Sequence, residues 1–386
     1  MLAQASGRRK PRLCLRNAGP RRGPLAWSPP RPTIARMDND DFLILRAGEA
    51  DGLVTPAEAL DAIEAAWREH GTARDGLATS AALSPAPLSP AALSLATPAA
   101  RLDVKGAVLA EAELAGFRLM SRGSIARDWI WLADLEGRPL ALVEASWLCA
   151  LRAATSAALA AKLLAAPGAS TAALIGAGRI AAHLPGVLAA ALPGLAALHV
   201  AARRPEAVAE FCAAHQATLA LHPAAGAAEA AAQADIVITL SSATTPLLHP
   251  RDLRPGTTLI ALGEADVAPE MLTGWAGRFV VDNPDFNAAG GNLGAWIASG
   301  AVTAETLAQR LGTDLGLVAA GLAPGREDPG QNLLAVVQGM AVGDLALAGM
   351  AWRKARLRRL GLRFPLGEAA ASRFRGPTPR RNRSLR

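Results

Sequence analysis

Metal centres and disulfide frameworks need residues that this chain hardly contains. Only three of its 386 residues are cysteine and only six are histidine. Cys14, Cys149 and Cys212 lie far apart and match no zinc or disulfide spacing, and the histidines form no metal-binding pair. The sequence therefore predicts no metal site, and the unpaired thiols favour a reducing compartment, the cytoplasm.

Long apolar segments without charge are also missing. The alanine-rich stretches 153–166 and 186–198 come nearest, but Lys162 interrupts the first and a proline the second. A membrane-spanning helix needs about 18 or more bulky apolar residues in succession. Residues 1–36 lack the apolar core of an export signal, and Met37 offers an alternative start. We expect a soluble protein with no membrane partner.

Positive charge is concentrated at the two ends. The formal net charge is +7, but residues 1–36 carry nine Lys and Arg and residues 373–386 carry six Arg, with no acid in either segment. The body, 37–372, is therefore at −8. An acidic body does not fit a nucleic-acid-binding fold, so we expect no nucleic-acid partner and interpret 1–36 and 369–386 as disordered basic extensions.

The most informative stretch runs from residue 172 to residue 204. It predicts an apolar strand ending at Ile175, a glycine turn, a helix over about 179–191 and a second strand over 198–202. A glycine turn alone would also fit an ordinary loop. Strand, turn, helix and strand at this spacing favour a βαβ unit that binds a dinucleotide.

Three small residues form the turn, with the spacing Gly176-x-Gly178-x-x-Ala181. Gly176 permits a tight turn, Gly178 lets the backbone approach a pyrophosphate, and Ala181 lets the helix pack closely on the strand. The helix N-terminus then offers backbone N–H groups to the phosphates. We also include Ser241, which follows a later strand, among the expected cofactor-binding residues.

Two arginines stand where an NAD site normally has an acid. The second strand of the βαβ unit runs into Arg203 and Arg204, with no Asp or Glu on the ribose side. Guanidinium groups at this point suit a 2′-phosphate, so the sequence predicts NADP as the cofactor, with NAD possible. The alternative is a solvated arginine pair at the end of a strand.

Before this unit, the sequence predicts a strand, a helix and a small sheet. The helix begins at Thr55-Pro56 and runs to about residue 70, and the low-complexity stretch 77–100 predicts a loop. Ser146 is the expected N-cap of a long helix. The remaining elements are strands over 41–45, 101–108, 116–121, 129–134 and 139–144, and that long helix over 147–165.

After it, alternating strands and helices predict a parallel, doubly wound sheet. The later strands are expected over 236–240, 258–262 and 279–282, and a long helix over 332–351. We therefore predict an α/β protein in which a Rossmann-type sheet is inserted into a second, α+β domain. The expected boundaries are 37–166 for the N-terminal part of the α+β domain, 167–325 for the Rossmann domain and 326–368 for the return to the α+β domain.

Several segments, in order, resemble the ornithine cyclodeaminase/μ-crystallin family over about residues 40–366. They are Arg138-Pro-Leu-Ala-Leu-Val-Glu, Leu151-Arg-Ala-Ala-Thr-Ser-Ala-Ala-Leu-Ala-Ala-Lys162, Ile175-Gly-Ala-Gly178, Ala234-Asp-Ile-Val-Ile-Thr239, Leu253-Arg-Pro-Gly-Thr-Thr-Leu-Ile-Ala-Leu-Gly263, Gly321-Leu-Ala-Pro-Gly-Arg326 and Gly339-Met-Ala-Val-Gly-Asp344. The resemblance implies a homodimer whose α+β domain binds substrate and forms the dimer. It also implies hydride chemistry on a small amino or imino acid.

The resemblance assigns Arg152 to the substrate carboxylate, for which a guanidinium offers a two-pronged fork. The alternative is a solvated arginine. Two further candidates depart from the family pattern. Arg118 stands where the family commonly has a lysine, and an arginine does not shuttle protons. Asp266 lies one place later than the catalytic aspartate of cyclodeaminases, so it is either that acid or a surface carboxylate. Asn292 also stands where glutamate is common.

These features predict an NAD(P)-dependent oxidoreductase that reduces a small α-imino acid or oxidises the matching amino acid. Arg118 and the shifted Asp266 weigh against ornithine cyclodeamination, which needs versatile acid and base groups. That activity remains the first alternative. The second is an NADP-binding protein without turnover.

Overall fold

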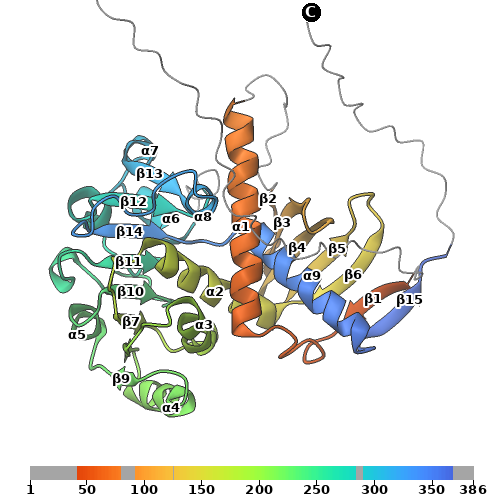
Figure 1. The fold of residues 1–386 in the computed structure, drawn as a ribbon, viewed down its shortest axis with the longest axis horizontal. Coiled ribbons are helices and arrows are strands. Elements are labelled where there is room, and N and C mark those ends of the chain that lie inside the picture. The colour runs from red at the N-terminus through yellow and green to blue at the C-terminus, as the bar shows by residue number, and fades with distance from the viewer. Residues whose placement is uncertain (1–40, 80–91, 125, 284–289, 368–386) are drawn as a thin grey trace, which may run out of the picture. The chain divides into compact units, whose positions relative to one another are not determined.

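Two sheets and the helices that pack on them make up the part of the chain that the computed structural model describes, residues 41–79, 92–124, 126–283 and 290–367 (Figure 1). The two basic ends lie outside these residues. One hydrophobic core extends from the first sheet through the helices to one face of the second sheet. A second core covers the other face of the second sheet.

The first sheet has seven strands in the order β15-β1-β6-β5-β4-β3-β2. Neighbouring strands are antiparallel except for β1 and β6. The strands are β1 (Asp41–Leu45), β2 (Ala92–Ala96), β3 (Ala100–Leu109), β4 (Leu114–Gly123), β5 (Asp128–Ala133), β6 (Pro139–Glu144) and β15 (Leu362–Pro365). Five of them confirm the prediction. In contrast, β2 lies where low complexity predicts a loop, because pairing with β3 supplies backbone hydrogen bonds that composition does not reveal.

Helix α1 (Pro56–Thr79) lies between the two sheets (Figure 1) and packs against α2, α3, α8 and α9. Its start confirms the prediction. Glu58 N–H donates to Thr55 Oγ1 at 3.4 Å, and Thr55 N–H donates to Glu58 Oε2 at 3.0 Å, which is a capping box. The helix extends well past the predicted end near residue 70, because these tertiary contacts stabilise its later turns.

Helix α2 (Ser146–Leu164) is almost entirely buried. Among the described helices, it alone has the length and apolar composition to cross a membrane, but 83% of its apolar window is buried inside the fold. The predicted serine cap is wrong. Ser146 Oγ instead donates to Glu144 Oε1 and accepts from Asp128 N–H at 3.4 Å, so it joins β5, β6 and the helix start. The composition of α2 is that of a core helix.

The second sheet has eight strands in the order β13-β12-β14-β11-β10-β7-β8-β9, and all its neighbours are parallel. Its central strands are buried on both faces, which explains their continuous apolar sequences. The strands are β7 (Thr171–Ile175), β8 (Ala197–Ala201), β9 (Leu221–Pro223), β10 (Ile236–Thr239), β11 (Thr258–Ala261), β12 (Arg278–Val281), β13 (Leu311–Asp314) and β14 (Leu333–Val336). This doubly wound sheet confirms the predicted fold class.

Short helices connect these strands. They are η1 (Ala181–His183), α3 (Leu184–Ala191), α4 (Pro205–His215), α5 (Ala227–Ala232), η2 (Pro250–Asp252), η3 (Met271–Trp275), α6 (Gly291–Ala298), α7 (Ala304–Arg310) and α8 (Leu315–Ala319). The strand order reverses between β7 and β10, and doubly wound sheets bind their ligands outside the carboxyl ends of the strands at such a point.

The long helix predicted over 332–351 is wrong in its first part. β14 is a strand between β11 and β12, and α9 (Ala341–Leu357) begins after it. The run Leu333-Leu-Ala-Val336 is buried on both faces, an environment that sequence periodicity does not distinguish from a buried helix. Sheet membership therefore also contradicts the boundary expected at 325/326, because the chain returns to the first sheet only after β14.

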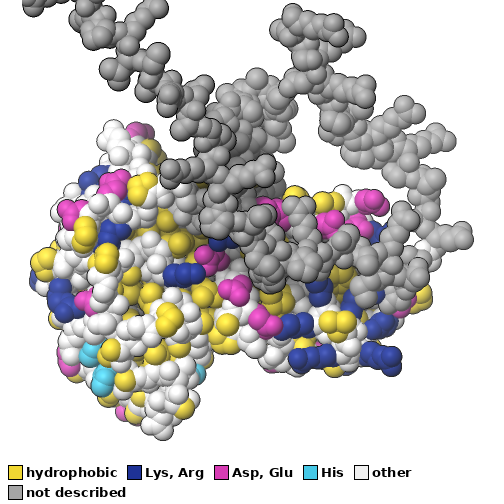
Figure 2. All heavy atoms as spheres, viewed as in Figure 1, with side chains coloured by type: hydrophobic (Ala, Val, Ile, Leu, Met, Phe, Trp, Pro, Cys, Tyr) yellow, Lys and Arg dark blue, Asp and Glu magenta, His cyan; other side chains and the backbone are white. Residues whose placement is uncertain are grey.

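The surface carries charges of both signs (Figure 2). Basic side chains gather at the end of the first sheet where α9 finishes, and exposed arginines follow that helix at 358, 359 and 363.

Candidate active site

The glycine turn lies between β7 and the start of η1. Gly176 has φ +124°, in the region that favours glycine, and its N–H donates to Ala201 O of the neighbouring strand at 2.7 Å. A Cβ on Gly176 would lie 2.7 Å from Leu240 O. The turn therefore requires glycine at 176, as predicted.

Gly178 faces open space, because a Cβ built there would have no heavy atom within 4 Å. Its carbonyl accepts from Ala182 N–H at 3.1 Å at the start of the helical segment. Ala181 is 1% exposed and packs into the core. The turn thus combines a tightly packed base with an open apex at the switch point of the sheet, which is the shape that a pyrophosphate requires.

Arg203 and Arg204 follow β8, beside the glycine turn, and both are exposed. Neither guanidinium forms an ion pair or hydrogen bond within the described part of the chain. Ala201, which accepts the Gly176 N–H, precedes them by two and three residues. The structure therefore brings both arginines to the edge of the sheet that carries the glycine turn, where they are available to an anion.

A second cluster joins α2, α9 and the first sheet around Asp344. Arg152 Nε donates to Asp344 Oδ1 at 2.9 Å, and Arg118 Nη1 donates to Asp344 Oδ2 at 3.3 Å. Arg118 Nη2 also donates to Asp128 Oδ2 at 3.0 Å. All four residues are at least 93% buried. The cluster is a buried ion network that links residues far apart in the sequence.

Each charge in this network depends on its neighbours. Burial alone would raise the pKa of Asp344, but the Arg152 and Arg118 guanidiniums hold it below its ordinary value. Burial likewise opposes the charge of Arg118, yet Asp344 and Asp128 hold the pKa of Arg118 above its ordinary value. Asp344 and Arg118 are therefore both charged at neutral pH.

Arg152 keeps two nitrogens for a ligand. Of its three guanidinium nitrogens, only Nε forms a hydrogen bond with a described residue, so Nη1 and Nη2 remain available. Gly339, at φ +92°, lies directly against this guanidinium, and its N–H donates to Asp282 Oδ2 at the end of β12. Arg152 thus presents the free part of its fork where the two sheets meet, which supports its predicted role with a carboxylate.

Arg118 does not reach a substrate in this arrangement. Both of its terminal nitrogens bind carboxylates, and its Nε is buried without a hydrogen-bond partner in the described structure. Its side chain is 8% exposed. Arg118 therefore binds and orients the carboxylates of Asp344 and Asp128. The sequence instead predicts a catalytic position for it.

Asp266 is fully buried, so it is neither a surface carboxylate nor open to a substrate. Its carboxylate accepts from Thr239 Oγ1 at 3.2 Å, Ser241 Oγ at 2.9 Å and Asn292 Nδ2 at 3.1 Å. A Cβ on Gly263 would lie 1.9 Å from Asp266 Oδ2. Asp266 holds the loops after β10 and β11 together, and it orients Ser241, which lies beside the glycine turn.

The two departures at 266 and 292 belong together. Asn292 donates to Asp266 Oδ1 and to Gly263 O at 3.0 Å, and it accepts from Val267 N–H at 3.1 Å. A glutamate at 292 would instead place a second carboxylate against Asp266 in a buried space. The amide is therefore the side chain that matches the shifted aspartate.

Sequence analysis missed Asp344, Asp128, Asp282 and Lys105. Asp344 and Asp282 are single carboxylates whose partners are distant in the sequence, whereas Asp128 pairs with Arg118 across two neighbouring strands. Lys105 lies on β3 directly opposite Arg118 on β4. Only the strand register could have revealed it.

Comparison with known proteins agrees with this architecture. Residues 127–357 match the model of the ornithine cyclodeaminase/mu-crystallin family. Among solved structures, a probable ornithine cyclodeaminase from Bordetella pertussis Tohama I is similar, with a TM-score of 0.70, 26% identity, and coverage of 82% of this chain and 98% of that chain.

Two more distant structures share the fold. An archaeal alanine dehydrogenase dimer with bound NAD has a TM-score of 0.72 and 22% identity, covering 84% of this chain and 99% of that chain. Thermococcus litoralis Δ1-pyrroline-2-carboxylate reductase in complex with NADH and L-proline has a TM-score of 0.70 and 21% identity, covering 83% and 99%. A search of curated protein sequences finds no match.

Proposed function

Because the chain belongs to the ornithine cyclodeaminase/mu-crystallin family, we propose that it is an NAD(P)-dependent oxidoreductase that reduces a small α-imino acid or oxidises the matching amino acid. One juxtaposition carries the proposal. An open glycine turn at the switch point of the second sheet lies beside the start of α2, where Arg179 Nη1 donates to Ser146 O at 3.1 Å, and α2 carries Arg152, whose two terminal nitrogens are available. The first suits a dinucleotide and the second a carboxylate.

Gly176, Gly178 and Ser241 would hold the dinucleotide, and Arg203 and Arg204 would hold a 2′-phosphate. The two exposed guanidiniums, with no acid beside them on the ribose side, support NADP over NAD. When bound, the nicotinamide supplies or accepts a hydride.

The protein's own residues bind and orient the substrate. Arg152 grips the carboxylate through Nη1 and Nη2, while Asp344 fixes the guanidinium through Nε. A carboxylate held at two points leaves the α-carbon few orientations, and such positioning contributes to catalysis by lowering the entropy that the reaction must lose. Cyclodeamination would need additional acid and base groups, and the enclosed positions of Arg118 and Asp266 favour simple reduction over it.

A homodimer formed through the outer face of the first sheet is part of the proposal. Phe117 is 41% exposed there, and its ring stacks 6.3 Å from that of Trp131, which lies 5.0 Å from Phe42. An aromatic row that is exposed at its Phe117 end fits a second copy of the chain. Light scattering should give a dimer for the wild type and a monomer for Phe117→Lys. Leu322→Lys, a matched change at another exposed apolar position, should stay dimeric.

The test of function is oxidation of NADPH and NADH with pyrroline-2-carboxylate, piperideine-2-carboxylate and pyruvate plus amines, beside NAD(P)⁺ reduction with ornithine, lysine, proline and alanine. We expect NADPH-dependent reduction of at least one imine. Formation of proline and ammonia from ornithine would establish the cyclodeaminase alternative. Tight NADPH binding without turnover of any compound would establish a binding protein.

A further inference from the structure

The inward face of the β3–β4 ribbon changes from apolar to charged along its length. Leu109 pairs with Leu114 in the core. Four residues earlier in β3, Lys105 pairs with Arg118. Residues directly opposite in an antiparallel pair have their side chains on the same face of the sheet. Lys105 therefore lies on the face that carries Arg118, the face covered by α9.

Charged groups surround the Lys105 ammonium. It is half-buried and lies within electrostatic range of Arg152, Arg118, Asp344 and Asp282. Asp344 belongs to α9, whereas Asp282 directly follows β12 of the second sheet. Burial first, and then Arg152, lowers the pKa of Lys105 below its ordinary value. The amine thus sits where the two sheets meet, beside the proposed carboxylate-binding arginine.

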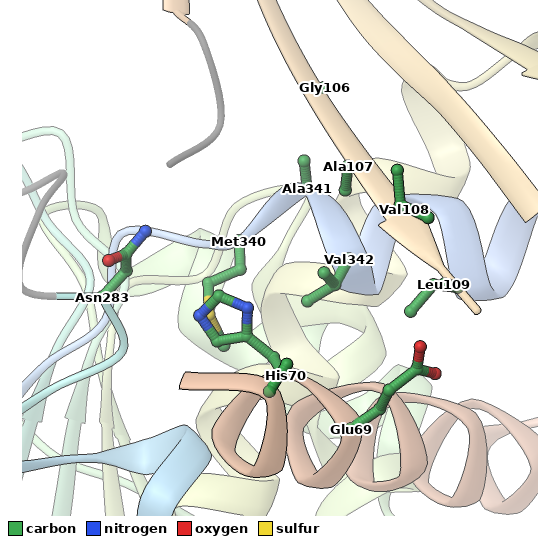
Figure 3. Close-up of a pocket in the computed structure, with 11 residues that line it drawn as sticks. Glu69, His70, Gly106, Ala107, Val108, Leu109, Asn283, Met340, Ala341 and Val342 are labelled. Atoms are coloured by element: carbon green, nitrogen blue, oxygen red, sulfur yellow. The ribbon is translucent and has the colours of Figure 1, made fainter. Parts of the chain in front are cut away.

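A cavity of about 60 Å³ adjoins this position. Figure 3 shows Gly106 and Ala107 of β3 on one side, Met340 and Ala341 from the start of α9 below them, and Asn283 of the second sheet across the space. Glu69 and His70 of α1 also line this cavity, and α9 and the segment after β12 carry Asp344 and Asp282, two of the charged groups near Lys105. A small group bound between the sheets would therefore lie next to β3 at the Lys105 position.

Lysine is scarce in this chain. There are four lysines and 36 arginines, and Lys10 lies outside the described residues. Lys162 pairs with Glu64 at 2.6 Å and Lys354 pairs with Glu58 at 2.5 Å. Arginine does not release its proton in proteins, whereas a lysine amine does when its surroundings oppose the charge. Among the described residues, Lys105 is the lysine at the meeting of the sheets.

We propose that Lys105 is a catalytic residue that exchanges the substrate's proton. This inference rests on the proposed function. In reduction, the imine carbon receives the hydride, and the electron pair of the C=N double bond takes a proton from Lys105 Nζ. The products are the amine, the oxidised cofactor and a neutral Lys105, which regains its proton from solvent. In amino-acid oxidation, neutral Lys105 accepts the amine proton as the hydride leaves.

The kinetic test compares Lys105→Arg and Lys105→Met with Lys162→Met as the matched control, all in the full-length protein. Both Lys105 variants should lose about 10²–10⁴-fold in kcat, since arginine keeps the charge but not the transferable proton. Their affinity for NADPH should be unchanged. Lys162→Met should keep the wild-type kcat. If Lys105→Arg retains wild-type kcat, the residue contributes only charge and the inference is overturned.

The pH dependence separates a proton donor from a positioning residue. In the wild type, kcat for reduction should fall as the pH rises through the lowered pKa of Lys105, and kcat for oxidation should rise over the same range. Both pH dependences of kcat should vanish in Lys105→Met. If both pH dependences of kcat persist in that variant, another group titrates and the inference is overturned.

A readout without turnover distinguishes failure of this inference from failure of the proposed function. Amine labelling of the wild type, followed by mass spectrometry, should show Lys105 protected by proline and labelled at lower pH than Lys162. Absence of protection overturns the inference even in an active enzyme. An enzyme that reduces no imine overturns the proposed function and the catalytic role together, and protection would then still place the amine at a carboxylate site.

Discussion

The backbone of Gly339 lies against the guanidinium of Arg152, so closely that a Cβ on residue 339 would come within 2.0 Å of Nη1. The Gly339 N–H is also bound to Asp282. Gly339 therefore joins the start of α9, the arginine of α2 and the end of β12. The position of the Arg152 guanidinium depends on the absence of a side chain at this one residue.

Gly339→Ala should displace Arg152 and weaken substrate binding. The clash adds to the strain of a positive φ, which costs about 1–2 kcal/mol for a residue with a Cβ. Gly321→Ala is the control, because Gly321 has φ +73° but open space around its Cβ. We expect similar losses of stability from backbone strain in both variants, and an increase in KM of about tenfold or more only in Gly339→Ala. Equal KM values in the two variants would contradict the role of this contact.

Arg152→Lys should lower kcat/KM for the acid by about tenfold to a hundredfold, because it keeps a positive charge but loses the two-pronged fork. Steady-state kinetics on the active imine would measure this effect, with NADPH affinity as the internal control. Wild-type kcat/KM in the variant would show that Arg152 has no contact with substrate.

Asp344→Asn should destabilise the fold by about 3–5 kcal/mol, because it leaves Arg152 and Arg118 in a buried site without their shared carboxylate. The folded-state pKa of Asp344 is lowered, so its stabilising contribution is present above the unfolded value near 3.9 and is lost as the pH falls through the folded value. Urea unfolding should therefore show the largest difference between wild type and variant near neutral pH, narrowing below about pH 4. A difference that is constant with pH would exclude ionisation as its source.

Arg203→Ala and Arg204→Ala should each weaken NADPH binding by about tenfold to a hundredfold, which corresponds to a charge-assisted hydrogen bond of about 1.5–3 kcal/mol. NADH lacks the 2′-phosphate, so its affinity should hardly change in either variant. Fluorescence titration with both cofactors measures the contrast. Equal affinities for NADPH and NADH in wild type and variants would mean that the pair is merely solvated.

Asp266→Asn should reduce stability more than it reduces rate. Its carboxylate accepts three hydrogen bonds in a fully buried site, and an amide there would oppose one of the donors, at a cost of about 1–3 kcal/mol. Thermal unfolding and kcat, measured together, test this. A variant with unchanged Tm and a kcat lower by about 10²-fold or more would restore Asp266 as a catalytic acid.

Local patterns were sufficient for much of the fold. The capping box at Thr55 and Glu58, the glycine turn at 176–178 and most strands of both sheets depend on residues close together in the chain. Such features follow from backbone sterics, capping and hydrophobic periodicity, which a sequence displays directly. β14 escaped prediction because a short apolar run buried on both faces has the same pattern in a strand and in a helix.

The site itself depended on contacts between distant residues. Asp344 pairs with Arg152, which is 192 residues away in the sequence, and with Arg118, which is 226 residues away. Lys105 lies on the same face as this cluster because of the register of β3 on β4. Asp266 lies in the loop after β11, at the carboxyl edge of the sheet, but it is fully buried and therefore closed to a substrate. The sequence alone determined which cofactor-binding unit this chain contains, because its glycines act through local backbone geometry. Only the tertiary structure decided which charged groups are enclosed and which remain available, since burial and pairing of charges are properties of residues brought together by folding.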